Sequence, residues 1–132
     1  MDEYLKPTSS FLRLLKEYKQ YNSLVVAFDF DNTVYDYHKK GETYYFVSEL
    51  LRELKEIGCY LICFTANPDE YFVSTYLKLN NIPFNKINEN PPFFKSESRK
   101  IYYNALLDDR AGLLQVYNDL KTLTIHIKQN EN

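Results

Sequence analysis

Two aspartates separated by a single residue, Asp29 and Asp31, follow a short apolar run and are followed in turn by Asn32 and Thr33. The apolar run, residues 24–28, is continuous, which is typical of a strand buried on both faces of a parallel sheet. Open α/β sheets bind their ligands at the carboxyl ends of such strands. The pair alone fits a polar turn after a core strand as well as it fits a functional site.

Polar side chains also follow two later apolar segments. Thr65 follows residues 59–64, and the acidic pair Asp108 and Asp109 follows residues 105–107. A strand, a helix and a second strand in this order form a right-handed crossover between parallel strands. The strand ends therefore share one edge of the sheet, and we expect the carboxylates and the threonine to lie together there.

The residue types at this edge predict phosphoryl chemistry with a divalent cation. Carboxylates crowded at one edge are unfavourable without compensation, because buried like charges cost several kcal/mol each. Mg²⁺ compensates them by accepting one or two carboxylates together with waters and phosphate oxygens. A basic segment with Lys95 and Lys100 precedes the last strand. The Thr65 hydroxyl and a lysine ammonium group beside the ion suit a dianionic phosphoryl group. One carboxylate can then attack phosphorus to give an aspartyl-phosphate, while its neighbour transfers the proton of the leaving group.

Amphipathic helices are expected between the strands. The first covers about residues 8–20, and packing on the sheet explains its apolar stripe more simply than a partner does. The clearest helix covers residues 42–57 and ends at Gly58, the residue type that commonly follows a helix end. A further helix is predicted to begin at Pro68, with Asn67 as its cap. The expected apolar face of that helix consists of Tyr71, Phe72, Thr75, Tyr76 and Leu79.

The later segments are less regular. Residues 82–87 predict a short edge strand, because a proline within a strand is tolerated mainly at sheet edges. Residues 88–99 predict a loop, and residues 128–132 predict a frayed tail. The apolar spacing over residues 113–127 favours a helix, but residues 122–127 alternate as a strand does, and both interpretations stay open.

Length and composition restrict the class of protein. The 132 residues fit one α/β domain, 1–132. A composition with 45% hydrophobic and 26% charged residues excludes a globally disordered chain. A net charge of −2 gives no nucleic-acid footprint. The chain has no apolar run near the roughly 20 residues that span a bilayer. It does not start as a signal peptide does, so a cytoplasmic protein without a membrane partner is expected.

The two cysteines, Cys59 and Cys63, lie on one apolar run, where alternation puts both on the same strand face. We expect reduced core residues, because structural disulfides belong to oxidising compartments. A zinc site is not expected, because His38 and His126 are far apart in sequence and stand in unrelated contexts. His38 is interpreted as a solvated loop residue in preference to a substrate contact.

The sequence resembles the haloacid dehalogenase superfamily of phosphatases. Four motifs carry the resemblance. The first is residues 29–34 (Asp-Phe-Asp-Asn-Thr-Val), and the second is Phe64-Thr65. The third is a single lysine, and the fourth is residues 106–109 (Leu-Leu-Asp-Asp). The motifs keep the order of the family and extend over residues 24–112, most of the chain. The first motif alone is moderately specific, and its combination with the preceding apolar run and the later acidic pair is strong.

The resemblance implies a Rossmann-like, three-layer α/β/α fold with a mainly parallel sheet, and the activity of a Mg²⁺-dependent phosphatase. Asp29 would be the nucleophile. Asp31 would be the general acid and then the base for water attack, with its backbone carbonyl on Mg²⁺. Asp29 and Asp108 would also bind the ion, and Asp109 would bind it through water or orient the site. Thr33 would support the first loop without taking part in the chemistry.

Phosphate binding is implied for Thr65 and Ala66, with Asn67 in support, and for one lysine. Lys100 is favoured over Lys95, because it closely precedes the last acidic strand, as the lysine does in small members of the family. The other lysine is then a solvated surface residue.

Two features depart from the family pattern. Position 32 is Asn where Gly is commonest, which bears on substrate preference more than on activity. The chain has no room for a cap domain, since only residues 34–41 precede the second helix and residues 68–99 hold one helix and a loop. In such a capless member, water exclusion and substrate choice depend on short loops, a second subunit or a bulky substrate. Two aromatic pairs, Tyr35 with Tyr37 and Phe93 with Phe94, could help to exclude water and select the substrate. Core packing explains the pair Phe93 and Phe94 equally well.

Other functions stay open beside the phosphatase. One is a catalytically silent binding or regulatory domain with the same fold, and another is a phosphotransferase with an acceptor other than water. A phospho-receiver domain is excluded by motif order, because there the acidic pair comes first and the phosphorylated Asp stands alone. Sugar phosphates, nucleotides and phosphorylated macromolecules all fit as substrates, and a homo-oligomer stays open.

Overall fold

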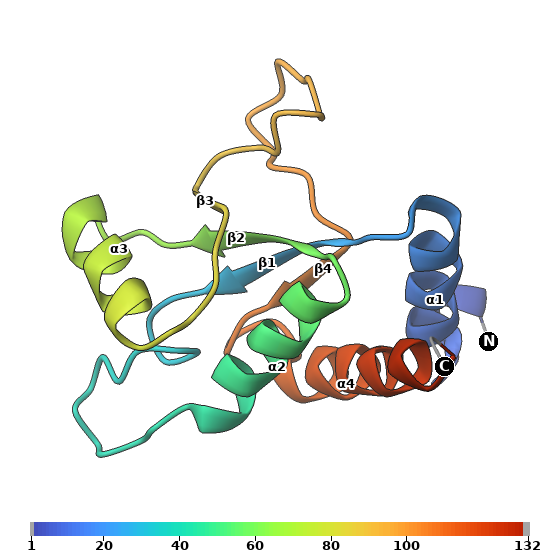
Figure 1. The fold of residues 1–132 in the computed structure, drawn as a ribbon, viewed down its shortest axis with the longest axis horizontal. Helices are drawn as coiled ribbons and strands as arrows, with labels where there is room; N and C mark the ends of the chain where they lie inside the picture. Colours follow the sequence, from blue (N-terminus) through green and yellow to red (C-terminus); the bar gives the residue numbers. More distant parts are fainter. Residues whose placement is uncertain (1, 131–132) are drawn as a thin grey trace.

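A parallel sheet forms the centre of the protein (Figure 1). The computed structural model describes residues 2–130, and within them the strands are β1 (Val25–Asp29), β2 (Tyr60–Phe64), β3 (Lys86–Ile87) and β4 (Ala105–Leu107). Their order in the sheet is β3-β2-β1-β4, and every neighbouring pair is parallel. This sheet confirms the predicted Rossmann-like α/β class without a cap domain.

Helices connect the strands. Within the described residues these are the short 3₁₀ turn η1 (Glu3–Leu5) and the α-helices α1 (Ser9–Tyr21), α2 (Tyr45–Glu56), α3 (Glu70–Leu79) and α4 (Leu113–Gln129). The structure answers the open question near the end of the chain. Residues 122–127 are helical, and α4 continues to Gln129, past the predicted start of the tail. Residues 131–132 of that tail lie outside the described residues.

The end of α2 and the shortness of β3 both have clear physical causes. Gly58 follows α2 with a φ of 87°, a left-handed conformation that glycine adopts without a steric penalty, so the predicted helix end is confirmed. The predicted edge strand exists, but it is confined to Lys86–Ile87 beside β2, and the segment that contains Pro83 stays irregular. Proline lacks the N–H that a longer ladder needs.

The start of α3 differs from the prediction. Helical residues begin at Glu70, and the side chain of Asp69 accepts a hydrogen bond of 3.0 Å from the N–H of Phe72, as an N-cap does. The prediction that Asn67 caps a helix starting at Pro68 is therefore wrong. The amide oxygen of Asn67 instead accepts a hydrogen bond of 2.9 Å from the N–H of Asp69, and this turn leads into the helix.

The buried face of α3 also differs from the prediction. Val73 and Leu77, four positions apart on one side of the helix, are fully buried, whereas Tyr71 and Leu79 are 82% and 77% exposed. Of the predicted apolar face, Tyr76 packs on the core. The rings of Phe72 and Tyr76 both pack edge-on against Phe30, with centroids 6.1 and 5.5 Å apart.

The register places the strand ends at one edge. In the central strand β1, Asp29 pairs with Phe64 of β2, and Phe28 pairs with Leu107 of β4. Thr65 directly follows Phe64, and the acidic pair 108–109 directly follows Leu107. The expectation that these residues leave the sheet at its carboxyl edge is confirmed.

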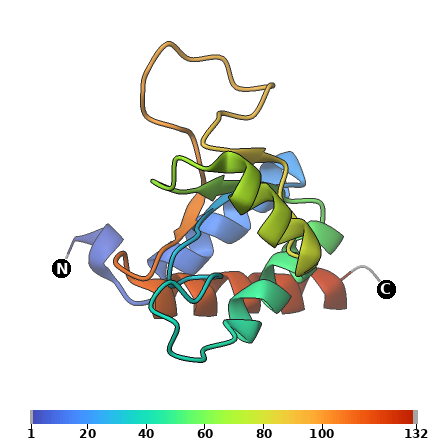
Figure 2. The same cartoon turned by 90° about the vertical axis from the view of Figure 1, so that its left-hand side faces the viewer.

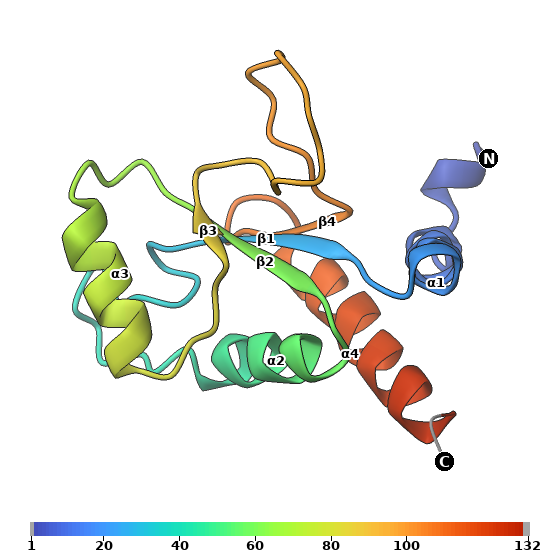
Figure 3. The ribbon, with the colours of Figure 1, turned by 45° about the horizontal axis from the view of Figure 1, so that its top comes forward.

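The two faces of the sheet are covered differently. Val26 and Phe28 of β1 share the main core with Leu50 from α2 and Leu120 from α4. Helices α2 and α4 lie on this side of the sheet, and the segment 88–104 lies on the other (Figures 2 and 3). Helix α1 packs on α4 at the far end of the sheet from α3 (Figure 1).

The segment 88–104 covers the second face without forming a helix or a strand. Val25, Ala27 and Ile62 form a smaller core there. Partly buried apolar side chains pack on that smaller core: Tyr60, Phe64, Ile101, Tyr102, Tyr103 and Leu106. The predicted loop is thus confirmed and extends to residue 104, and it supplies an aromatic layer over this face.

Cys59 and Cys63 are free, buried and part of the main core, which confirms them as unpaired core residues. Burial raises the pKa of the Cys59 thiol to about 11, so this side chain stays a protonated, apolar group at neutral pH. Across residues 2–130, no helix combines the length and the apolar character that crossing a membrane requires.

Candidate active site

Three carboxylates meet at the carboxyl edge of the sheet. Side-chain oxygen atoms of Asp29, Asp108 and Asp109 lie within 4.8 Å of one another. Asp29 ends β1, and the other two residues follow β4, its neighbour in the sheet. Asp29 and Asp108 are partly buried and Asp109 is exposed, so the cluster opens to solvent on one side. A set of oxygen donors alone suits a hard divalent cation.

Thr33 connects the two loops that carry these carboxylates. Its side chain is fully buried. The hydroxyl donates a hydrogen bond of 3.5 Å to Oδ2 of Asp29 and accepts one of 3.2 Å from the backbone N–H of Asp109. Thr33 therefore holds the end of β1 and the loop after β4 at a fixed separation.

The loop after β1 is a tight turn around one carbonyl. The Phe30 carbonyl accepts hydrogen bonds from the N–H groups of Thr33, Val34 and Tyr35, at 3.4, 3.1 and 2.9 Å. Asn32 has a φ of 60°, in the left-handed region that favours glycine and, after it, asparagine. Asparagine at position 32 thus meets a backbone requirement of the turn.

Burial and repulsion raise the pKa of the Asp29 carboxyl to about 7 from its ordinary value of 3.8. Burial is the largest cause, followed by a hydrogen bond with the side chain of Asp109 and by the negative charges of Asp108 and Asp109. A hydrogen bond from the backbone N–H of Phe30 acts in the opposite direction. The cluster therefore favours either a proton or a cation at Asp29.

Asp31 lies beside the cluster and has an unsatisfied oxygen. Its Oδ1 atom is buried and has no hydrogen-bond partner among the described residues. Burial and then the charge of Asp109 raise the pKa of Asp31, and the charge of His38 lowers it. A buried carboxylate oxygen without a partner is unfavourable, so this position suits a protonated carboxyl or a ligand that donates a hydrogen bond.

His38 supplies the positive charge that acts on Asp31. The imidazole is exposed in the loop between β1 and α2 and packs edge-on against Tyr37, with ring centroids 5.2 Å apart. The carboxylate of Asp36 accepts hydrogen bonds from the N–H groups of Lys40 and Gly41, at 3.0 and 2.8 Å, and so shapes this loop. The expected solvent exposure of His38 is confirmed, and the loop also holds it near the acidic edge.

Thr65 follows β2 and is anchored by a residue that the sequence analysis did not single out. Asn88, directly after β3, accepts a hydrogen bond of 2.9 Å from the Thr65 N–H and donates one of 2.8 Å to the Thr65 carbonyl. The Thr65 hydroxyl accepts from the N–H of Asn67 at 3.0 Å, and Ala66 between them is exposed. The only sequence signal for Asn88 is a polar residue just after an edge strand.

The structure does not bring the two candidate lysines to the carboxylates. Lys95 and Lys100 are exposed in the segment 88–104, the middle of which extends away from the sheet as a loop (Figures 1 and 2). Among residues 2–130, no ion pair or hydrogen bond joins either lysine to an aspartate of the edge. Neither lysine is among the charges that shift the pKa of Asp29 or Asp31.

The two aromatic pairs separate in the structure. Tyr35 stacks on Phe30 with ring centroids 4.9 Å apart and packs, partly buried, against the main core, whereas Tyr37 is exposed. Phe93 and Phe94 line a cavity at the amino end of β1, away from the aspartates. Of these rings, only that of Tyr37 lies in the exposed part of the loop that also holds His38.

Comparison with models of protein families and with curated protein sequences found no match. A solved structure, described as the conserved protein coded by a locus from Bacteroides thetaiotaomicron, superposes on the chain with a TM-score of 0.60. The match covers 83% of this chain and 93% of that chain, at 23% sequence identity. Likeness at this identity shows a shared α/β fold. It assigns no function to the acidic edge.

Proposed function

We propose that the protein is a Mg²⁺-dependent phosphatase of the haloacid dehalogenase type, which hydrolyses phosphomonoesters through an aspartyl-phosphate on Asp29. The observation that carries the proposal is the cluster of Asp29, Asp108 and Asp109, whose oxygens lie within 4.8 Å at the ends of neighbouring parallel strands. The cluster offers oxygen ligands only, as Mg²⁺ prefers. Mg²⁺, when bound there, would offset the negative charge of the carboxylates and of the phosphate.

The chemical steps are assigned to Asp29 and Asp31. An oxygen of Asp29 attacks phosphorus, and the bond from phosphorus to the leaving oxygen breaks while Asp31 gives that oxygen a proton. Asp31 then takes a proton from water, which attacks phosphorus and releases inorganic phosphate from Asp29. The raised pKa and the unpartnered, buried Oδ1 of Asp31 support its role as the acid, because both favour a proton on this carboxyl.

The remaining residues would position the phosphate and the nucleophile. Thr33 fixes Asp29 against the loop after β4, as its two hydrogen bonds indicate. Thr65 and Ala66 are assigned to the phosphate oxygens, with Asn67 in support, because Thr65 follows the register partner of Asp29. Lys100 is assigned as the phosphate-binding lysine, with Lys95 as its alternative, and either assignment requires the segment 88–104 to approach the edge.

A silent binding or regulatory domain is the second candidate function. The observation that favours it is the lack of a lysine or arginine, within residues 2–130, among the charges acting on Asp29 and Asp31. Transfer of a dianionic phosphoryl group is slow without a cation that stabilises the transition state beyond the metal. In that case the edge would bind a divalent cation without turnover.

Hydrolysis of para-nitrophenyl phosphate with and without Mg²⁺ tests the proposal. The native chain, Asp29→Asn and the control Asp2→Asn, an exposed residue far from the edge in sequence, are compared. We expect metal-dependent hydrolysis by the native chain and the control, and only background hydrolysis by Asp29→Asn. Mg²⁺ binding by calorimetry without turnover, together with no binding of beryllofluoride, supports the silent domain. Absence of both metal binding and turnover contradicts both functions.

A further inference from the structure

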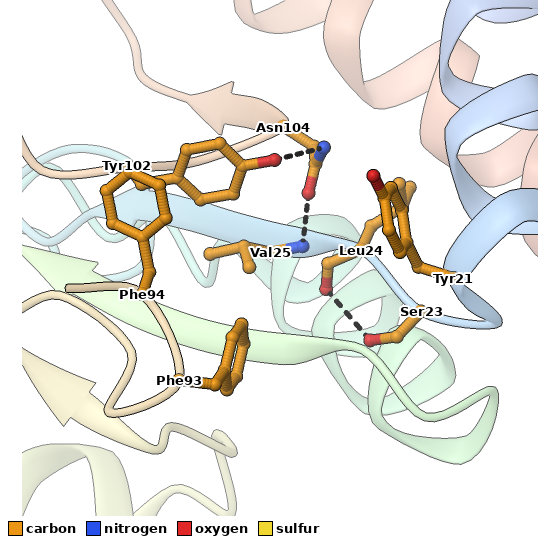
Figure 4. Close-up of a pocket in the computed structure, with 8 residues that line it drawn as sticks. All are labelled: Tyr21, Ser23, Leu24, Val25, Phe93, Phe94, Tyr102 and Asn104. Atoms are coloured by element: carbon orange, nitrogen blue, oxygen red, sulfur yellow. Dashed lines mark hydrogen bonds between the residues drawn. The ribbon is translucent and has the colours of Figure 1, made fainter.

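A cavity of about 500 Å³ lies at the amino end of β1, at the opposite end of that strand from Asp29 (Figure 4). Its floor includes Val25, and its walls carry the rings of Tyr21, Phe93, Phe94 and Tyr102. The volume falls within the roughly 300–1,000 Å³ of small-molecule sites. The phosphatase proposal gives this cavity no role.

The aromatic walls come from separate parts of the chain and are held by other rings. Phe94 stacks on Tyr102, with ring centroids 4.5 Å apart and an angle of 22° between the planes. Phe93 packs edge-on against Tyr60, with centroids 5.4 Å apart at 83°. In Figure 4 the stacked pair and Phe93 flank the start of β1 from two sides, and Tyr21 lies at the far end. The rings are therefore positioned before any ligand arrives.

Most polar side-chain atoms of the cavity are hydrogen-bonded within the protein, but two hydroxyls keep a proton for a ligand. The Ser23 hydroxyl donates to the Gly58 carbonyl at 2.8 Å, whereas the Tyr21 hydroxyl only accepts, from Gln20 at 3.2 Å, and the Tyr102 hydroxyl is the second. The Asn104 amide oxygen accepts from the N–H of Val25 at 2.7 Å, and its nitrogen donates to Glu17 at 2.9 Å and to the Tyr102 hydroxyl at 3.2 Å. The Tyr102 hydroxyl is therefore an acceptor within the protein, and its own proton can be donated to a ligand.

The charge and exposure of the walls restrict the occupant. Among the described residues, no acidic or basic side chain lines the cavity. An ionic ligand would therefore lose its hydration without gaining a counter-charge. Phe93 is 68% exposed, although it stands over an apolar floor. Exposed rings grouped in this way indicate a binding surface, and they suit a flat partner that stacks or packs edge-on.

We propose that this cavity binds an uncharged, flat aromatic molecule, with its ring over Val25 among Phe93, Phe94 and Tyr102, and one acceptor atom at the Tyr102 hydroxyl. The site is separate from the acidic edge and takes ligands of different chemistry. Its occupancy therefore does not depend on the phosphatase function.

The test uses 2-naphthol as the probe and decahydro-2-naphthol as its saturated counterpart, because both are uncharged and carry one hydroxyl. Each compound is titrated into the ¹⁵N-labelled chain and followed by amide chemical shifts. We expect saturable shifts from 2-naphthol at Val25, Phe93 and Tyr102, none at Asp29 or Asp108, and at least about tenfold weaker binding of the saturated compound.

Variants keep the test specific. Phe93→Ala is expected to weaken 2-naphthol binding about tenfold, whereas the control Phe46→Ala, which removes a 71% exposed ring of α2, leaves it unchanged. Thermal melts confirm that both variants are folded. Equal binding of the saturated compound, or equal effects of the two variants, would overturn the proposal. A concentration-dependent dimer in sedimentation that Phe93→Ala dissociates would also overturn it, because a second copy of the chain would then cover the rings.

Discussion

The buried hydroxyl of Thr33 accepts a hydrogen bond of 3.2 Å from the backbone N–H of Asp109, which lies 76 positions further along the chain. The same hydroxyl donates to Asp29 at 3.5 Å. One small side chain thus joins the nucleophile proposed at the end of β1 to the acidic loop after β4. This link adds to the pairing of β1 with β4, which brings the two loops to the same edge.

Replacement of Thr33 by valine tests the link, since valine has nearly the same shape and no hydroxyl. We expect the free energy of unfolding to fall by about 1–3 kcal/mol, because the Asp109 N–H loses its partner. Chemical denaturation measures the change. Thr75→Val on α3 is the matched control, because within residues 2–130 the partly buried Thr75 side chain makes no hydrogen bond. Equal stability of Thr33→Val and the native chain would show that the Thr33 hydroxyl contributes nothing to the free energy of unfolding.

The raised pKa of Asp29 predicts a pH dependence of stability in the metal-free protein. The carboxyl has a pKa of about 7 in the folded chain and an ordinary value of 3.8 when unfolded. The folded state binds this proton more tightly than the unfolded state does. Protonation of Asp29 therefore stabilises the fold in full below pH 3.8, and this stabilisation is lost as the pH rises through about 7. Solvent screening of a partly exposed group reduces the loss to about 1–2 kcal/mol.

Denaturation of metal-free protein at pH 4.5 and at pH 7.5 measures this dependence. Asp29→Asn lacks the titrating group, and we expect it to lose less stability between the two pH values than the native chain does. At pH 7.5 the variant should also be the more stable of the two. Identical pH dependence of stability in both proteins would show that Asp29 is not the carboxyl group with the raised pKa.

Metal binding should stabilise the folded chain, because the cluster exists only when β1 and β4 are neighbours. Mg²⁺ at 100 times its dissociation constant adds about 2.7 kcal/mol to the free energy of unfolding. We expect this gain at pH 7.5 in the native chain and in Asp2→Asn, and its loss in Asp108→Asn. Thermal melts with Mg²⁺ and after chelation give the readout. An undiminished gain in Asp108→Asn would remove that residue from the ligand set.

The acidic edge could be predicted from the sequence because few physical rules determine it. The apolar run before Asp29 requires a buried strand, and the crossover rule makes the next strand parallel. The ends of both strands then share one edge whatever the details of the helices. The contact between Asn88 and Thr65 could not be predicted, because the register of β2 and β3 creates it across 23 positions.

The ambiguous and mistaken elements have equally specific causes. Residues 122–127 have the periodicity of both a helix and a strand, and only burial of Leu120, Leu123 and Thr124 against the rest of the protein decides for the helix. Asn67 and Asp69 are both good caps, and the chain uses the second. The segment 88–104 has no period at all, so its aromatic packing over β1 follows from tertiary contacts alone.

The assignment of a lysine in that segment leads to the last prediction. If Lys100 binds the phosphate during turnover, Lys100→Ala should lower kcat/KM for para-nitrophenyl phosphate by about 10- to 100-fold, because a developing negative charge loses its cation. Lys95 lies in the same exposed segment, so Lys95→Ala is the matched control, and we expect its kcat/KM to change by less than about twofold. Both variants should bind Mg²⁺ as the native chain does, since neither lysine contacts the carboxylates.

The pattern of effects separates the remaining assignments. A large effect of Lys95→Ala with none of Lys100→Ala exchanges the two roles. No effect of either variant on an active enzyme would exclude both lysines from phosphate binding and would make His38, the positive charge that acts on Asp31, the next residue to test. In that case His38→Gln should reduce kcat/KM for para-nitrophenyl phosphate, because Asp31 would lose the positive charge that acts on it.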